Sequence, residues 1–118
     1  MHYRIGTRGS KLALVQSEYV KRRMEEAYPE DTFELVIIKT TGDKVTDKPL
    51  AAIGTKGLFV KEIEEELLSG SIDMAVHSMK DMPAECETGL TFAKAWKRED
   101  CRDVLILKTC LLYTSDAA

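Results

Sequence analysis

The order of apolar and polar residues predicts alternating strands and helices along the first part of the chain. Residues 3–7 are predicted to form a short strand, and Ser10 is placed to cap a helix over residues 11–28 that Pro29 closes. Residues 33–39 are β-branched and apolar through their centre, which is typical of a strand buried on both faces. The pattern therefore indicates a βαβ unit in a parallel or mixed sheet.

The apolar stripe of the first helix follows the helical period. It is predicted to consist of Ala13, Val20, Met24 and Ala27, flanked by Leu12 and Tyr19. Beyond the second strand, residues 40–57 lack any periodicity, and a loop of this length is usually functional or mobile. A second helix follows. Its apolar face is predicted to consist of Phe59, Ile63 and Leu67, and Gly70 is predicted to end it. Further strands are predicted at residues 72–77, 90–95 and 104–107.

The last nine residues, 110–118, continue none of these patterns. Their letters, CLLYTSDAA, correspond to the translation of a transposon-end sequencing adaptor. We therefore expect residues 110–118 to be a non-native tail, and the fold is predicted without them. Residues 1–109 are expected to form one domain, with the native sequence of this chain known as far as Thr109.

Composition is that of one globular domain of 118 residues, with 44% hydrophobic and 31% charged residues. The net charge is −3, and its distribution is uneven, because residues 1–61 hold 11 basic against 8 acidic residues and residues 62–118 hold 6 against 12. This bias is too weak for the dense basic face that duplex nucleic acid requires. It favours a small anionic ligand bound by the first half of the chain.

No apolar run approaches the roughly 20 residues needed to span a bilayer, and the N-terminus lacks a signal peptide's apolar stretch. A cytoplasmic location, or a plastid stroma after import, is the resulting expectation. The cysteines show no metal-ligand spacing, and their odd number argues against a disulfide framework. They are expected to be reduced thiols, at Cys86, Cys101 and Cys110.

Polar side chains follow three of the predicted strands, and ligands of open α/β sheets bind at the carboxyl ends of strands. Arg8, Lys56 and Lys80 are therefore expected to converge on one crevice. Two hydroxyl donors join them there, from Ser10 and Ser78. Such a site suits a substrate that bears several carboxylates. Asp81 would be an acid among cations, an arrangement suited to holding or moving a proton on a cationic nitrogen.

Each of these residues also has a structural interpretation. Arg8 fits a solvated turn, Lys56 fits a simple loop charge, and Ser78 with Asp81 fits a capping or turn pair. A packed, hydrogen-bonded role is expected for His77 at the end of a buried strand, and a core role fits Phe59. Taken singly, none of these residues decides between the two interpretations.

Four separated segments together resemble the hydroxymethylbilane synthase (porphobilinogen deaminase) family. They read IGTRGSKLALVQS, TTGDKVTDKPLAAIGTKGLFVKEIEEELL, SIDMAVHSMKDMPAE and KREDCRDVLI. The likeness runs in order over residues 3–107. It implies an incomplete α/β lobe, the first of three domains, resembling a lobe of type 2 periplasmic binding proteins. Ala52 departs from the family, many of whose members carry a lysine at that position.

The resemblance also implies an activity. The family polymerises four porphobilinogen molecules into hydroxymethylbilane, releasing ammonia, on a dipyrromethane cofactor linked to a cysteine of the third domain. By position, Asp81 is implied as the catalytic aspartate and Phe59 as the aromatic beside the substrate. The implied ligands of cofactor and substrate carboxylates are Arg8, Ser10, Lys56, Ser78 and Lys80. Family members are usually monomers, with neither nucleic acid nor membrane as a partner.

The second and third domains of the family have no counterpart in these residues. We therefore expect the 118-residue chain to be inactive alone and to fold marginally, because surfaces meant for other domains expose apolar area. Two other hypotheses remain open. The chain could be a non-catalytic lobe that binds small anions, or a short protein with a role of its own.

Overall fold

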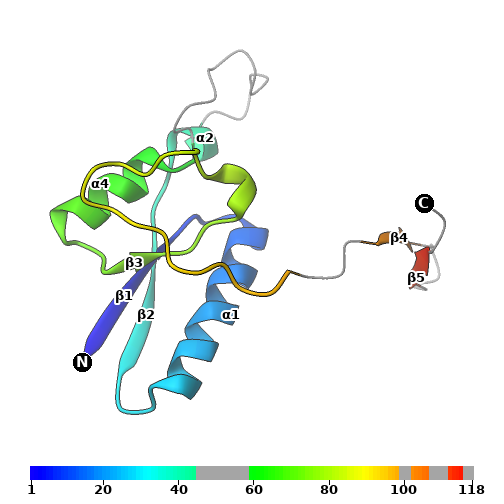
Figure 1. Ribbon diagram of the computed structural model, residues 1–118, viewed down its shortest axis with the longest axis horizontal. Coiled ribbons are helices and arrows are strands. Elements are labelled where there is room, and N and C mark those ends of the chain that lie inside the picture. Colours follow the sequence, from blue (N-terminus) through cyan, green and yellow to red (C-terminus); the bar gives the residue numbers. More distant parts are fainter. Residues whose placement is uncertain (45–58, 99–101, 107–111, 116–118) are drawn as a thin grey trace.

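A parallel three-stranded sheet forms the centre of the computed structural model, which describes residues 1–44, 59–98, 102–106 and 112–115 (Figure 1). Its strands are β1 (His2–Thr7), β2 (Thr32–Ile37) and β3 (Met74–Ala75), in the order β2-β1-β3. The pairing of β1 with β2 is continuous along both strands, and β3 pairs with the second half of β1. The predicted α/β class is therefore confirmed, and of the two predicted alternatives, a parallel or a mixed sheet, the central sheet is parallel.

The first helix, α1 (Lys11–Ala27), begins and ends close to the predicted residues. Ser10 has an extended backbone, and its side chain accepts a hydrogen bond from the backbone N–H of Ala13, which is the geometry of an N-cap. At the other end Tyr28 donates to the carbonyl of Met24, and Pro29 follows, which cannot continue a helix.

One polar contact fastens α1 to the sheet. The hydroxyls of Thr7 and Ser17 lie 2.6 Å apart, and both residues are fully buried. The predicted apolar stripe does not include Ser17, which is buried. It includes Ala27, which is exposed. Because buried hydroxyls are costly unless they are hydrogen-bonded, this pair stabilises one packing of α1 on β1.

The prediction that the second strand is buried on both faces is wrong. β2 lies at the edge of the sheet, with β1 as its only strand neighbour among the described residues. Phe33 is buried and stacks on Tyr3 with a centroid distance of 5.4 Å, but Ile37 is 60% exposed. A continuous apolar run cannot distinguish an edge strand from a central one, because strand order is decided by tertiary contacts.

Two helices lie between β2 and β3 in the described sequence. The short α2 (Thr41–Lys44) replaces the start of the predicted loop, and the rest of that loop lies outside the described residues. The second predicted helix is α4 (Lys61–Ser69), so Phe59 precedes it rather than lying on its face. Gly70 ends α4 as predicted, with a φ of 80° that favours glycine.

Of the strand predicted at residues 72–77, only Met74 and Ala75 pair with β1 as a strand. Backbone bonds from Asp73 to Arg4 and from Val76 to Gly6 extend its contact with β1. The buried apolar core lies around β1 and α4 and consists of Ile5, Phe33, Val60, Ile63 and Ile72. A single 3-10 turn, η1 (Met79–Asp81), follows β3.

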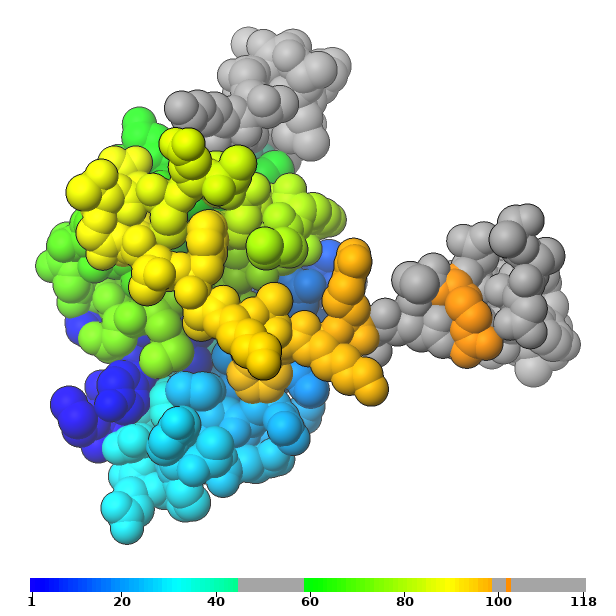
Figure 2. Space-filling view, viewed as in Figure 1, coloured from blue at the N-terminus to red at the C-terminus, as the bar shows by residue number. Residues whose placement is uncertain are grey.

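The strand predicted at residues 90–95 is wrong. Residues 90–98 have no regular structure, and all but the first of them are exposed. They spread over the surface of the molecule, yellow to orange in Figure 2, where Trp96 makes an edge contact with Tyr19 of α1. Without a neighbouring strand to accept its backbone bonds, an apolar segment has no reason to become a strand.

A second sheet holds two antiparallel strands, β4 (Asp103–Ile106) and β5 (Leu112–Ser115). It lies apart from the parallel sheet (Figure 1). β4 agrees with the predicted strand, whose last residue lies outside the described part. β5 was not expected, since it falls within the predicted non-native tail, and the origin of that tail stays a prediction.

Candidate functional site

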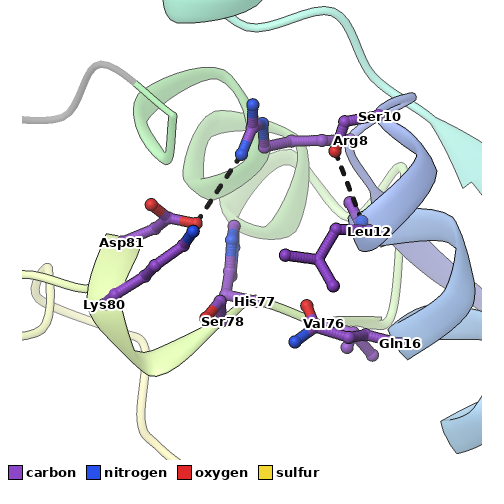
Figure 3. Close-up of a pocket in the computed structure, with 10 residues that line it drawn as sticks. Arg8, Ser10, Leu12, Gln16, Val76, His77, Ser78, Lys80 and Asp81 are labelled. Atoms are coloured by element: carbon purple, nitrogen blue, oxygen red, sulfur yellow. Dashed lines mark hydrogen bonds and ion pairs between the residues drawn. The ribbon is translucent and has the colours of Figure 1, made fainter. Parts of the chain in front are cut away.

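A cleft of about 180 Å³ opens at the carboxyl ends of β1 and β3. Figure 3 shows its walls, which come from the start of α1, the end of β3 and η1. The lining residues are Arg8, Ser10, Leu12, Ala13, Gln16, Val76, His77, Ser78, Lys80 and Asp81. In a sheet of order 2-1-3, ligands bind at the junction of these two strands, so the cleft lies where the topology predicts a site.

Arg8 occupies the centre of the site and is only 17% exposed. Its Nη2 donates to Oδ1 of Asp43 at 2.7 Å, and its Nε lies 3.2 and 3.3 Å from the two carboxylate oxygens. Pairs of this fork geometry are stronger and more directional than single hydrogen bonds. The interpretation of Arg8 as a solvated turn residue is therefore wrong.

Asp43 is held from its other side by Thr40, whose hydroxyl donates to Oδ2 at 2.8 Å. Partial burial by itself would raise the pKa of Asp43. The hydrogen bonds from Arg8 and Thr40, together with the positive charge of Arg8, outweigh burial and hold this pKa below its ordinary value. Asp43 is therefore a carboxylate, and it stays charged beside the guanidinium.

Two further groups contact Arg8. Its Nη1 lies 3.6 Å from Oδ2 of Asp81, within ion-pair distance, and the two side chains point toward one another in Figure 3. The Arg8 guanidinium carbon also lies 4.0 Å from the centroid of the Phe59 ring, a cation–π contact. One cation thus joins two carboxylates and an aromatic ring.

The Phe59 ring lies directly on the backbone of Gly42 in α2. A side-chain Cβ at Gly42 would overlap the ring, so the close approach requires glycine at this position. α2 is fastened to α4 by Glu62, whose carboxylate accepts hydrogen bonds from the backbone N–H and the hydroxyl of Thr41. Burial opposes ionisation of Glu62, but the bonds from Thr41 lower its pKa overall.

His77 follows β3, lines the cleft and is half-buried. Burial lowers its pKa, and the charge of Arg8 lowers it further, while Asp81 opposes both effects. The net shift is downward, so the neutral imidazole is favoured. Partial burial agrees with the packed half of the expectation for His77, and its hydrogen-bonded half stays a prediction.

The expected site residues come together. Arg8, Ser10, Ser78, Lys80 and Asp81 all line the cleft, and Phe59 contacts Arg8. Lys56 lies outside the described residues. The turn interpretation of Ser78 and Asp81 also holds for the backbone, because Ser78 precedes η1 and its carbonyl accepts from the N–H of Asp81. A backbone turn and a side chain in the cleft are compatible.

Sequence reasoning missed the role of Asp43. Asp43 falls in residues 40–57, which the sequence pattern predicts as a loop, and that pattern gives the acid no partner. One signal could have found this pair. Asp43 follows the end of one strand, and Arg8 follows the end of the neighbouring strand. Gln16 was missed as well, and it lines the cleft from α1.

The chemistry of the cleft is cationic and rich in hydroxyls, with one acid facing it. Such donors suit the carboxylates of an organic anion. Within the described ranges, no group of histidine, cysteine or acidic residues is arranged to hold a metal ion. Nor does any helix of that part combine the length and apolarity needed to cross a bilayer.

Comparison with known proteins decides the family. The family model described as "porphobilinogen deaminase, dipyromethane cofactor binding domain" matches residues 3–117 of the chain. The chain belongs to the porphobilinogen deaminase family. The resemblance found in the four sequence segments is therefore confirmed.

Relatives named porphobilinogen deaminase agree with this assignment. The protein from Lachnospira eligens is 96% identical over 109 residues, which cover 92% of this chain and 37% of that relative. The protein from Clostridioides difficile is 58% identical over 108 residues, which cover 92% of the chain and 36% of the relative. The chain thus spans little more than a third of the length of these relatives.

Proposed function

We propose that this chain is the cofactor- and substrate-binding lobe of a hydroxymethylbilane synthase, which joins four porphobilinogen molecules and releases ammonia at each step. The chain contributes part of the site, and the 118 residues alone are inactive. The observation that carries the proposal is the Asp81 carboxylate, 15% exposed, within ion-pair distance of Arg8 in a cleft lined by hydroxyls and a second cation.

The cleft fits the dipyrromethane cofactor by the chemistry of its donors. The acetate and propionate groups of a pyrrole need cations and hydrogen-bond donors. Arg8 and Lys80 supply cations, and the hydroxyls of Ser10 and Ser78 supply donors. The oxygen of Ser10 is used as the cap of α1, but its proton remains available for a carboxylate. When bound, the cofactor supplies the pyrrole to which substrate is added.

Asp81 is proposed as the catalytic residue. Loss of ammonia and addition of a pyrrole both place positive charge on a pyrrole nitrogen. A fixed carboxylate stabilises that charge more than it stabilises the neutral ground state, and this difference is what speeds a reaction. Asp81 lies on the 3-10 turn η1, and its ion pair with Arg8 holds the carboxylate toward the cleft.

Lys56 is proposed as a further cation for the carboxylates and Phe59 as the aromatic that flanks the substrate. Phe59 has support from its contact with Arg8. A finer fold assignment, to a lobe of the type 2 periplasmic binding protein kind, is supported by the parallel sheet with a ligand cleft at its switch point.

The experiment uses a full-length chimera, in which residues 1–109 of this chain are joined to the part of the Lachnospira eligens relative that follows the matched segment. We expect the chimera to consume porphobilinogen and to release ammonia and hydroxymethylbilane. Asp81→Asn should lower kcat by at least about a hundredfold, as loss of a main electrostatic group does. The 118-residue chain alone should make no product.

Asp31→Asn is the matched control, because Asp31 pairs with the N-terminal amine and not with the cleft. It should leave kcat within about twofold, as exposed ion pairs contribute little. Full activity of Asp81→Asn, or product formation by the 118-residue chain, would contradict the proposal. A chimera that binds porphobilinogen without consuming it would favour the alternative, a non-catalytic anion-binding lobe.

A further inference from the structure

We propose that Asp43 is a positioning residue, which holds one edge of the Arg8 guanidinium so that the opposite edge, Nη1, faces the cleft. This inference rests on the proposed function and adds a residue to it. Asp43 does not line the cleft. Its effect on the reaction therefore passes through Arg8.

The geometry of the pair supports this role. A guanidinium is planar, with five donor hydrogens in a fixed arrangement. Asp43 engages the Nε and Nη2 side through three contacts between 2.7 and 3.3 Å. Once that side is held, the plane of the group and the direction of Nη1 are fixed. The Phe59 ring below the guanidinium carbon fixes the same plane from its face.

Asp43 is itself held in place from its own backbone segment. Its Oδ2 accepts from the hydroxyl of Thr40, which is fully buried, and its backbone N–H donates to the Thr40 carbonyl at 3.1 Å. The carboxylate therefore cannot turn to follow Arg8. An anchor of this kind loses little conformational entropy when a ligand binds, because its side chains are already ordered.

Asp81, the second acid beside Arg8, explains why the contact with Asp43 affects the site. Nη1 lies 3.6 Å from Asp81, so Arg8 is shared between two carboxylates. If Asp43 lost its charge, the guanidinium could turn within the plane set by the Phe59 ring and bind Asp81 with two hydrogen bonds. Arg8 would then be lost to substrate carboxylates, and Asp81 would be occupied. Asp43 prevents this by engaging Arg8 more closely than Asp81 does.

The chain contains a matched pair that lies outside the cleft. Arg4 donates from Nε and Nη2 to both oxygens of Asp73, at 3.1 and 3.2 Å, which closely repeats the Arg8–Asp43 arrangement. It joins β1 to the segment after α4, and neither residue lines the cleft. Asp73→Asn therefore removes an arginine–aspartate pair from the same lobe without changing the site.

The experiment compares Asp43→Asn, Arg8→Lys, the double variant and Asp73→Asn in the full-length chimera. Cofactor loading is measured by intact-protein mass spectrometry, and KM and kcat are measured with porphobilinogen. We expect Asp43→Asn to lower cofactor loading and to raise KM by about tenfold, as the loss of a charge-assisted hydrogen bond does. Asp73→Asn should change both by less than about twofold.

In the Arg8→Lys background, Asp43→Asn should add less than about twofold, because lysine lacks the fork that Asp43 holds. Thr40→Val is the second variant if Asp43→Asn does not fold, and it should raise KM in the same direction by about threefold. Normal loading and KM in Asp43→Asn or Thr40→Val would overturn the inference. An unmodified chimera that loads no cofactor and makes no product would instead overturn the proposed function, and this inference with it.

Discussion

The guanidinium carbon of Arg8 lies 4.0 Å from the centroid of the Phe59 ring, which joins the end of β1 to the start of α4. The same ring packs against Gly42, so α2 also contacts the residues around Arg8. Replacement of Phe59 by Leu retains apolar bulk but removes the π face. A cation–π contact contributes about 0.5–1 kcal/mol when exposed and about 2 kcal/mol when desolvated, and Arg8 lies between these cases.

We therefore expect Phe59→Leu in the chimera to raise KM for porphobilinogen by about two- to fivefold, with a smaller effect on kcat. Phe59→Tyr retains the ring and serves as the control, which should stay near the unmodified value. The prediction is checked by steady-state kinetics. Equal effects of Leu and Tyr would mean that the π face of the ring contributes nothing to Arg8.

Gly42→Ala should destabilise the lobe by about 1–3 kcal/mol, the usual cost of overpacking a close contact. The added Cβ would overlap the Phe59 ring, so either the ring or α2 must move. Urea unfolding of the chimera measures the change. At Gly9 a Cβ would lie 3.2 Å from one methyl carbon of Ile37, a much milder contact, and Gly9→Ala should cost less than Gly42→Ala. Equal costs would contradict this account.

The buried hydroxyl pair of Thr7 and Ser17 should couple in a double-mutant cycle. Ser17→Ala and Thr7→Val are each expected to lower the free energy of unfolding by about 1–2 kcal/mol, because the first removes a hydrogen bond that Thr7 accepts and the second leaves the buried Ser17 hydroxyl without its acceptor. The double variant should lose less than the sum, since no buried hydroxyl is then left unpaired. Strict additivity in urea unfolding would show that the pair does not contribute as a unit.

His77 should make the stability of the lobe depend on pH in mildly acidic solution. Burial and the charge of Arg8 lower its pKa in the folded state from the ordinary value of 6.5. Above pH 6.5 the imidazole is neutral in both states, and its contribution to stability is fully present. As the pH falls from 6.5 through the lowered folded pKa, the unfolded chain binds the proton first, and stability is lost.

Unfolding midpoints measured between pH 7.5 and 5 test this effect. His77→Gln removes the titrating group and should flatten the profile over that range. A profile that stays the same in His77→Gln would assign the pH dependence to other groups.

Local structure was predictable where the signal lies within a few residues. The cap at Ser10, the end of the first helix before Pro29 and the glycine that ends α4 were all placed from the sequence. Each depends on backbone hydrogen bonds between near neighbours, which the residue type largely decides. Residues 90–98 were predicted in part as a strand because apolar residues alone do not supply the partner that a strand requires.

The candidate site was predictable as a set of residues but not as a set of contacts. Strand ends in a parallel sheet converge, so the meeting of Arg8, Ser10, Ser78, Lys80 and Asp81 followed from the βαβ pattern. The pairing of Arg8 with Asp43 did not follow. It depends on a short helix after β2 that no periodicity marked, and on a Thr40 hydroxyl that becomes a partner only when buried.

The sequence by itself determined the family, the α/β class and which residues gather at the ends of the strands. These features depend on motifs and on hydrophobic period, both of which are local properties of a chain. The tertiary structure alone decided that, among the described strands, β1 is central and β2 is an edge, and that Arg8 is shared between Asp43 and Asp81. Strand order and the partner of a charged group depend on distances between segments far apart in sequence, and folding is what sets those distances.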